Sequence, residues 1–258
     1  MIPPYRWTSV IDMKKLDTTE IVTIGLCGAL YASFGYLTTL GIFAPVIGVV
    51  RFWPAVVVPA VFATLFGPRV GGLGAAIGIF ISDLVIHGNA LLSLTVGVPS
   101  NFLSFYLLGY IARKRNSVRV EIGGVILSGV FTLLAGILLV YAPQYLTGPT
   151  SLFFLGVGII SAVLTLSVYL MFPHWRLYQI ASVIGLGVGS MWIGVGVWFF
   201  SQFFVVTTTG ETSMPLYGAL GWFIWTYYTE IPFLILAVPP ILSACYRAFP
   251  TLRSYTEG

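Results

Sequence analysis

Residues 122–175 read IGGVILSGVFTLLAGILLVYAPQYLTGPTSLFFLGVGIISAVLTLSVYLMFPHW, and this stretch contains no Asp, Glu, Lys or Arg. Turn-forming residues interrupt it once, at 142–149 (APQYLTGP). A helix that spans a bilayer needs about 20 mostly apolar residues, so the stretch is long enough for two crossings. A soluble domain could not present so much uncharged surface to water. The sequence therefore predicts a helical membrane protein.

The composition of the whole chain agrees with this interpretation. Hydrophobic residues make up 58% of the chain and charged residues 8%, and the mean hydropathy is +0.97. Because no long polar segment divides the chain, we expect one transmembrane domain over 19–246, between a cytoplasmic segment (1–18) and a cytoplasmic tail (247–258). The net charge of +4 comes from basic residues in loops and tails, where they set topology, and we expect no nucleic-acid partner.

The apolar segments predict an all-α membrane protein, a polytopic helical bundle of about eight transmembrane helices with both termini cytoplasmic. The expected spans are 19–43, 50–67, 70–87, 90–112, 121–142, 150–172, 177–206 and 215–246. The orientation rests on Lys and Arg, which concentrate in cytoplasmic connections. With eight spans, Arg51 is the only basic residue in an outer connection.

Small residues repeat along the first span at four-residue spacing. Gly25, Ala29 and Ser33 form one ridge, and Gly28 and Ala32 form a second ridge beside it. Such ridges let another helix approach closely. They serve either packing within this chain or the docking of another membrane subunit.

Arg51 lies at the outer mouth of the second span and is followed by Phe52 and Trp53. An arginine at this depth can extend toward lipid headgroups. Alternatively, its guanidinium group clamps a carboxylate or phosphate of a solute that enters from outside.

Asp83 and His87 are four residues apart near the outer end of the third span, so they share a helix face. A carboxylate within a span is costly unless it has a partner or water. Asp83 therefore has two possible roles. It stabilises the bundle by pairing with His87 or a backbone donor, or it lines an outward-facing cavity.

Pro99 interrupts the fourth span near the middle of its length, and Asn101 follows it. Proline leaves a backbone carbonyl without its helical donor, and an asparagine side chain both donates and accepts. The segment is either a self-satisfied kink or part of a cavity wall.

The last span carries a stripe of aromatic and polar residues. Trp222, Thr226 and Glu230 follow one another at four-residue spacing, with Trp225 beside them. The rings alone could belong to an interfacial belt. Glu230 lies more than about ten residues inside the span, where a carboxylate indicates a functional site. An acid within an aromatic box would suit a flat, nitrogen-bearing heterocycle.

Several chemistries have no motif in this chain. We find no Walker loop, His-Glu-x-x-His or Cys-x-x-Cys motif, so we expect neither an enzyme nor a cofactor. His87 and His174 are predicted on opposite membrane sides, and we expect no metal site. Cys27 and Cys245 are interpreted as reduced packing residues.

The first half of the chain resembles a known family. The motifs are Val50-Arg51-Phe52-Trp53-Pro54, Ala63-Thr64-Leu65-Phe66-Gly67-Pro68, the run from Val70-Gly71-Gly72 through Gly78 to Ser82-Asp83, and Leu108-Gly109-Tyr110. With the small-residue first span, residues 19–113 resemble the substrate-binding S components of energy-coupling factor (ECF) transporters. That family usually has six spans, so residues 120–246 would supply additional and C-terminal helices.

The resemblance implies a subunit that captures a small vitamin-like solute in the cell membrane. Its partners would be the solute, the lipid bilayer, a transmembrane coupling subunit that docks on the small-residue ridge, and paired ATPase subunits. Two alternatives remain: a non-transporting accessory subunit of a larger membrane complex, and a stand-alone proton-coupled carrier that uses Asp83 and Glu230.

Overall fold

The computed structural model describes residues 16–38, 52–113, 118–141, 149–206, 210 and 212–252, with side chains excepted at 118–120, 131–132, 135–141 and 149–155. About 89% of the described residues are helical, and no strand occurs among them. This confirms the predicted all-α fold class.

Helices follow one another along the described chain, joined by short connections. They are α1 (Thr18–Leu37), η3 (Pro54–Val56), α2 (Val57–Phe66), α3 (Pro68–His87), α4 (Ala90–Leu92), the π-helical segment η4 (Ser93–Gly97), α5 (Val98–Ala112), α6 (Val118–Tyr141), α7 (Pro149–Met171), η5 (Pro173–Trp175), α8 (Arg176–Ser201) and α9 (Leu216–Ala248).

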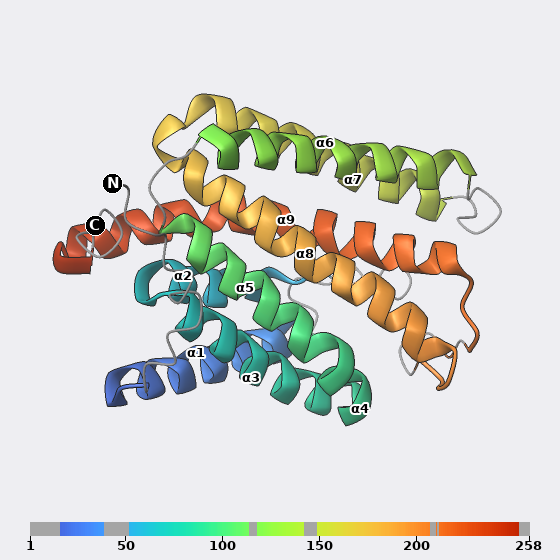
Figure 1. Cartoon of the computed structure of the whole chain (residues 1–258), viewed down its shortest axis with the longest axis horizontal. Helices are drawn as coiled ribbons and strands as arrows, with labels where there is room; N and C mark the ends of the chain where they lie inside the picture. The colour runs from blue at the N-terminus through green and yellow to red at the C-terminus, as the bar shows by residue number, and fades with distance from the viewer. Residues whose placement is uncertain are drawn as a thin grey trace, which may run out of the picture.

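The long helices run roughly side by side along one axis (Figure 1). Helices α1, α2, α3 and α5 form one group, and α6 and α7 lie on the opposite side of the molecule. Helices α8 and α9 pack between these groups, because α8 contacts α5 and α6 while α9 contacts α2 and α7. The beginning of α1 and the end of α9 lie at the same end of the bundle (Figure 1).

A capping box fixes the beginning of α1, at the spacing that the sequence predicts. The Asp17 carboxylate accepts a hydrogen bond from Glu20 N at 2.7 Å, and Asp17 N donates to Glu20 Oε2 at 3.2 Å. The two side chains satisfy amide groups that the first helical turn leaves without partners.

Glycines on α3 bring α1 and α3 into close contact. A Cβ atom at Gly74 would lie 2.6 Å from Cys27 Sγ, and one at Gly78 would lie 2.8 Å from the Gly28 carbonyl oxygen. Cys27 is completely buried here, as a packing residue should be. Because backbone atoms meet directly, larger residues at these positions would force the helices apart.

Carbonyl groups that prolines leave without a helical donor are satisfied by side chains. Pro232 has no N–H to offer the Tyr228 carbonyl, which accepts from Ser161 Oγ of α7 at 2.8 Å. Pro173 likewise has no N–H to donate to the Tyr169 carbonyl, and that oxygen accepts a hydrogen bond from Arg176 Nε at 3.1 Å. Each bond also ties two elements of the bundle together.

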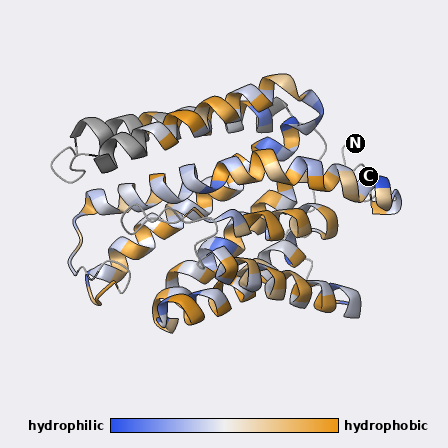
Figure 2. Ribbon diagram, turned by 180° about the vertical axis from the view of Figure 1, so that it is seen from behind, coloured by the Kyte–Doolittle hydropathy of each residue, from blue (hydrophilic) through white to orange (hydrophobic). Residues whose placement is uncertain are grey.

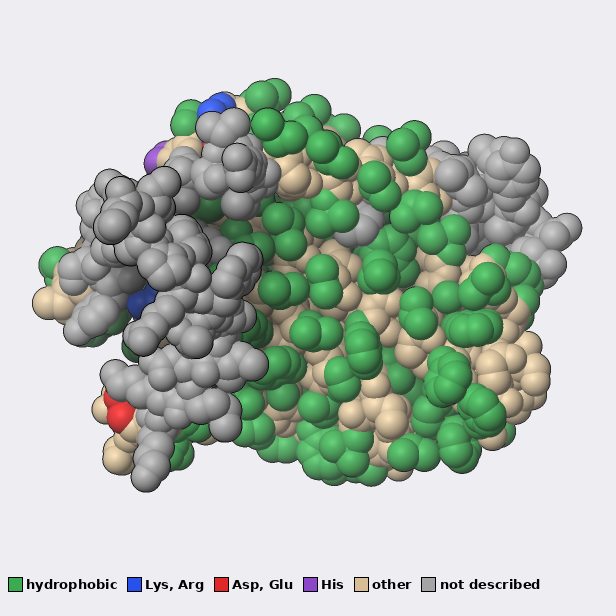
Figure 3. Space-filling model, viewed as in Figure 1, with side chains coloured by type: hydrophobic (Ala, Val, Ile, Leu, Met, Phe, Trp, Pro, Cys, Tyr) green, Lys and Arg blue, Asp and Glu red, His purple; other side chains and the backbone are tan. Residues whose placement is uncertain are grey.

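The outward surface of the bundle is apolar. Leu133, Leu166 and Met191 are 68%, 60% and 60% exposed, and each belongs to a different helix. Figure 2 shows apolar residues along the length of the helices. On the face in Figure 3, the charged and histidine side chains in view gather at one end, and the middle is hydrophobic or uncharged. Such a surface would be unstable in water and suits lipid.

Five helical segments are long and apolar enough to cross a membrane. They are Thr18–Leu37, Pro68–His87, Ala90–Ala112, Pro173–Ser201 and Leu216–Ala248. Each coincides with one of the predicted spans. The chain is therefore an all-α membrane protein.

The close contact between α1 and α3 can be tested at Gly78. We expect Gly78→Ala to lower the free energy of unfolding by about 1–3 kcal/mol, because the new methyl group meets backbone atoms. Gly129 on α6 has open space around its Cβ position, so Gly129→Ala should leave stability unchanged or raise it by up to about 1 kcal/mol. Thermal unfolding of the purified variants measures both, and equal midpoints would contradict the packing described.

Candidate functional site

A chain of hydrogen bonds crosses the bundle and is centred on Tyr31 of α1. Trp53 Nε1, just before η3, donates to Tyr31 Oη at 2.9 Å, and Tyr31 Oη donates to Asn101 Oδ1 of α5 at 2.7 Å. Asn101 Nδ2 in turn donates to the Gly97 carbonyl at 3.0 Å. Tyr31 is 1% exposed, so these polar groups satisfy one another in the interior.

Asp83 of α3 joins the same region through the π-helical segment η4. Ser93 Oγ donates to Asp83 Oδ2 at 2.6 Å. A Cβ atom at residue 97 would lie 2.6 Å from the same Asp83 oxygen. The carboxylate thus lies against the backbone at Gly97, which is also the residue whose carbonyl Asn101 binds.

The irregular helix that carries these residues follows from the local sequence. The π-helical residues 93–97 end two residues before Pro99, which has no amide hydrogen for the Thr95 carbonyl. Trp192 Nε1 of α8 donates to that carbonyl at 3.2 Å. The sequence left open whether this segment is self-satisfied or part of a cavity wall. Other helices supply much of its hydrogen bonding, and π-helical turns are frequent at functional sites.

Glu230 of α9 lies close enough to Tyr31 to interact with it electrostatically. Its side chain is half-buried, and the carboxylates of Glu230 and Asp83 both interact electrostatically with Tyr31. No hydrogen bond or ion pair to the Glu230 carboxylate occurs within the part of the chain that the structure describes. Two acidic side chains, far apart in the sequence, therefore converge on one phenol.

Phe52 contacts two aromatic rings of α9, the helix that carries Glu230. The Phe52 ring lies edge-on to Trp225 and to Phe233, with centroid separations of 6.4 Å in both pairs. Trp225 is buried, and Thr226 beside it is also buried, each with 8% exposure. That these rings and Glu230 form one binding site stays a prediction.

The structure brings together some of the predicted site residues and separates others. Asp83, Asn101 and Glu230 lie around Tyr31, as the preceding contacts show. Trp222 instead packs against an apolar cluster near the end of α8 and the beginning of α9, which includes Val197. His87 is the half-buried last residue of α3. Arg51 lies outside the described residues, so its role stays a prediction.

Tyr31 and Trp53 are the site residues that sequence reasoning missed. Tyr31 lies beside Gly28 and Ala32 on the buried face of the first span, where an aromatic residue resembles ordinary core. Ser93 and Gly97 were also not singled out. Their position in the sequence between Asp83 and Asn101 was a usable signal. A short break in a helix places its polar atoms near polar side chains on either side of it.

The two small-residue ridges of α1 face different surroundings. Gly28 and Ala32 are buried, and a Cβ atom at Gly28 would lie 3.3 Å from the Gly74 carbonyl oxygen of α3. Gly25, Ala29 and Ser33 are exposed. Packing within the chain therefore uses one ridge, and the other lies on the outward surface.

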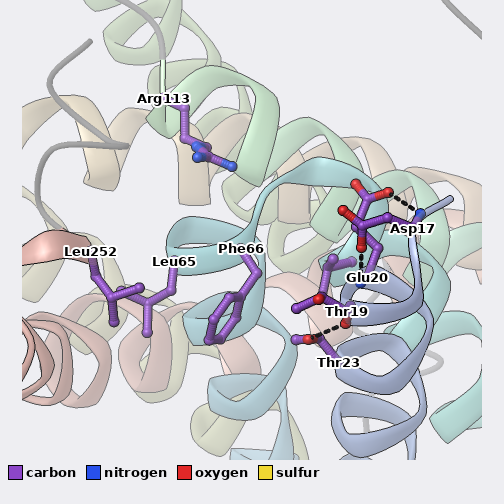
Figure 4. A pocket seen from close by; sticks show the side chains of 9 residues that line it. Asp17, Thr19, Glu20, Thr23, Leu65, Phe66, Arg113 and Leu252 are labelled. Carbon is purple, nitrogen blue, oxygen red and sulfur yellow. Dashed lines mark hydrogen bonds between the residues drawn. The ribbon is translucent and has the colours of Figure 1, made fainter. Parts of the chain in front are cut away.

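A hollow of about 320 Å³ lies at the end of the bundle where α1 begins. It is lined by Asp17, Thr19, Glu20, Thr23, Leu65, Phe66, Val70, Arg113 and Leu252. The acidic pair and Arg113 lie on different sides of it, and the apolar side chains of Leu65, Phe66 and Leu252 line a further side (Figure 4). Within the described ranges, no three His, Cys, Asp or Glu side chains are grouped to hold a metal ion.

Comparison of the chain with protein-family models, curated proteins and solved structures finds no match.

Both central hydrogen bonds of the network involve the Tyr31 hydroxyl oxygen, so removing that one atom breaks them both. Tyr31→Phe leaves Trp53 Nε1 and Asn101 Oδ1 buried without their partner, so we expect a loss of about 1–3 kcal/mol in unfolding free energy. Tyr106, which stacks on Phe102, is a matched control, and Tyr106→Phe should change stability little. Thermal unfolding measures the difference, and equal stability of the two variants would rule out an important role for the network.

Proposed function

We propose that this protein is a substrate-capture subunit of an ECF-type importer for a small, vitamin-like organic solute, embedded in the cell membrane. The resemblance of residues 19–113 to S components supports the proposal. So does the surface, which is suited to lipid over five helices. The protein is not expected to be an enzyme.

The observation that carries the proposal is the convergence of polar groups around Tyr31. Side chains from α1, α3, α5 and α9 meet there inside an apolar bundle. Ionisable groups within a membrane are costly and usually mark a pathway or binding site for a solute. A binding site in a bundle also needs a few polar groups among apolar and aromatic ones, and Phe52 and Trp225 provide rings nearby.

The complete topology belongs to the same proposal. We infer eight spans with both termini cytoplasmic. Helices α6 and α7 are 24 and 23 residues long, which is enough to cross a bilayer. In this topology four arginines at helix ends lie on the cytoplasmic side: Arg69, Arg113, Arg176 and Arg247. This agrees with the excess of positive charge that cytoplasmic connections carry. The Tyr31 network then lies in the middle to outer part of the membrane.

The coupling partners are proposed from the resemblance. A transmembrane coupling subunit would dock on α1, where the ridge of Gly25, Ala29 and Ser33 is exposed and can accept a close helix. ATPase subunits would supply the energy, because this chain has no nucleotide-binding motif.

One alternative is favoured by a specific observation. Asp83 and Glu230 are both half-buried acids near Tyr31, and paired acids within membranes also carry protons in carriers. A stand-alone proton-coupled carrier would transport its solute in liposomes without ATPase subunits, whereas a capture subunit would bind the solute and not transport it alone.

Native mass spectrometry of gently purified protein tests capture directly. We expect a bound small organic molecule at one per chain, and reduced occupancy in Tyr31→Phe, because the site loses its central hydroxyl. The control Tyr106→Phe should keep full occupancy. A stable complex with another membrane protein but no small molecule in any preparation would favour the accessory-subunit alternative.

The topology is tested by cysteine labelling with a membrane-impermeant reagent. In a background of Cys27→Ala and Cys245→Ser, we expect Thr208→Cys to be labelled in intact cells and Ser117→Cys to be protected. Both positions lie outside the described residues, in connections predicted on opposite sides. Labelling of position 117 in intact cells, with the membrane verified as sealed, would contradict the eight-span topology.

A further inference from the structure

The hollow beside the beginning of α1 lies at a membrane boundary of the bundle. Its volume is about 320 Å³, which is at the lower end of the range of roughly 300–1,000 Å³ for sites of small ligands. Of its lining residues, Thr19 lies in the first turn of α1, Val70 in the first turn of α3, and Arg113 directly after α5. All three helices belong to segments that can cross a membrane. The hollow is therefore at the depth where the headgroups of lipids lie.

One side of the hollow carries two carboxylates in a fixed arrangement. Asp17 Oδ1 accepts from Glu20 N at 2.7 Å, and Glu20 Oε2 accepts from Asp17 N at 3.2 Å. The capping box therefore uses one oxygen of each carboxylate. A carboxylate has two acceptor oxygens with about four lone-pair sites, so both side chains can accept from a further donor. This side of the hollow suits a cation that donates several hydrogen bonds, such as a primary ammonium group.

A different side of the hollow carries the guanidinium group of Arg113 (Figure 4). Arg113 Nη1 lies directly against Gly67, whose φ of 107° is a left-handed conformation that residues with a side chain rarely adopt. No side chain at position 67 thus separates the guanidinium group from the beginning of α3. A guanidinium group binds phosphate oxygens through parallel N–H donors, so this side suits a phosphate.

A further side of the hollow is apolar. The side chains of Leu65, Phe66 and Leu252 form it (Figure 4). Phe66 is 40% exposed, so the apolar side continues onto the outward surface of the bundle. The hollow thus offers carboxylates, a guanidinium group and an apolar surface to one molecule. A ligand that matches all three is amphipathic and carries both a cation and an anion.

We propose that the hollow binds the zwitterionic headgroup of a membrane lipid of the phosphatidylethanolamine type. Asp17 and Glu20 accept hydrogen bonds from its ammonium group, and Arg113 binds its phosphate. The first carbons of its acyl chains pack on Leu65 and Phe66. A choline headgroup has no N–H donor for the carboxylates, and a phosphatidylglycerol headgroup has no cation, so neither matches both charged sides. This site is separate from the Tyr31 network.

Native mass spectrometry of the full-length, delipidated protein in detergent measures binding of the first lipid. Among dioleoyl lipids, we expect phosphatidylethanolamine to bind at least about fivefold more tightly than phosphatidylcholine or phosphatidylglycerol, because only it makes charge-assisted hydrogen bonds on both sides of a partly exposed site. The double variant Asp17→Asn/Glu20→Gln should remove the preference over phosphatidylcholine, since Asn and Gln are neutral but retain the capping box. Arg113→Gln should weaken phosphatidylethanolamine binding, because the phosphate loses its partner. Glu121→Gln, at the beginning of α6, is the matched control and should keep the preference.

Equal affinity of the wild type for the three lipids would overturn the inference without requiring any variant, and so would an unchanged preference in the double variant. Glycerophosphoethanolamine has the same headgroup without acyl chains. We expect that an excess of it leaves the lipid bound, whereas displacement would assign the hollow to a soluble molecule and reject the lipid. The outcome is independent of the capture function. A protein that binds phosphatidylethanolamine selectively but no vitamin-like solute would retain this site and reject capture.

Discussion

One constraint shapes much of this structure: a polar backbone group inside an apolar medium is costly unless the protein supplies its partner. The carbonyls that Pro99, Pro173 and Pro232 leave without a helical donor show it clearly. Side chains of Trp192, Arg176 and Ser161 reach them from neighbouring elements. These bonds give the three carbonyl groups their hydrogen-bond donors. They also connect α8 to the segment before α5, α8 to α7, and α7 to α9. Irregular helices in this bundle therefore depend on tertiary contacts.

The same constraint distinguishes a structural polar group from a functional one. Tyr31, Trp53 and Asn101 form a complete set of donors and acceptors, so their cost in the interior is largely offset. These three side chains donate no hydrogen bond to the two nearby acids, Asp83 and Glu230. Asp83 has Ser93, and Glu230 has no described donor. The described residues thus hold one acid by a hydrogen bond and the other near Tyr31 by electrostatic interaction alone.

Close packing of α1 on α3 is what places Tyr31 in the network. The absence of side chains at Gly74 and Gly78 lets the two helices meet at backbone distance, and this brings Tyr31 within reach of Asn101. One face of α1 is thereby committed to the interior. The opposite face keeps Gly25 and Ala29 exposed. A single small-residue pattern thus packs α1 inside the chain with one ridge and leaves the other ridge exposed, which is where we propose that another subunit docks.

The sequence by itself determined the properties that depend on local composition. The uncharged run of 122–175 predicted two helices, where α6 and α7 occur. The Asp17–Glu20 spacing specified the start of α1, and a charge within an apolar span singled out Asp83 and Glu230. Only the tertiary structure decided which groups meet. Tyr31 and Asn101 are 70 residues apart in the sequence, and no periodicity encodes their contact. Nor could spacing tell which ridge of α1 faces inward, since both have the same small residues and only the position of α3 distinguishes them.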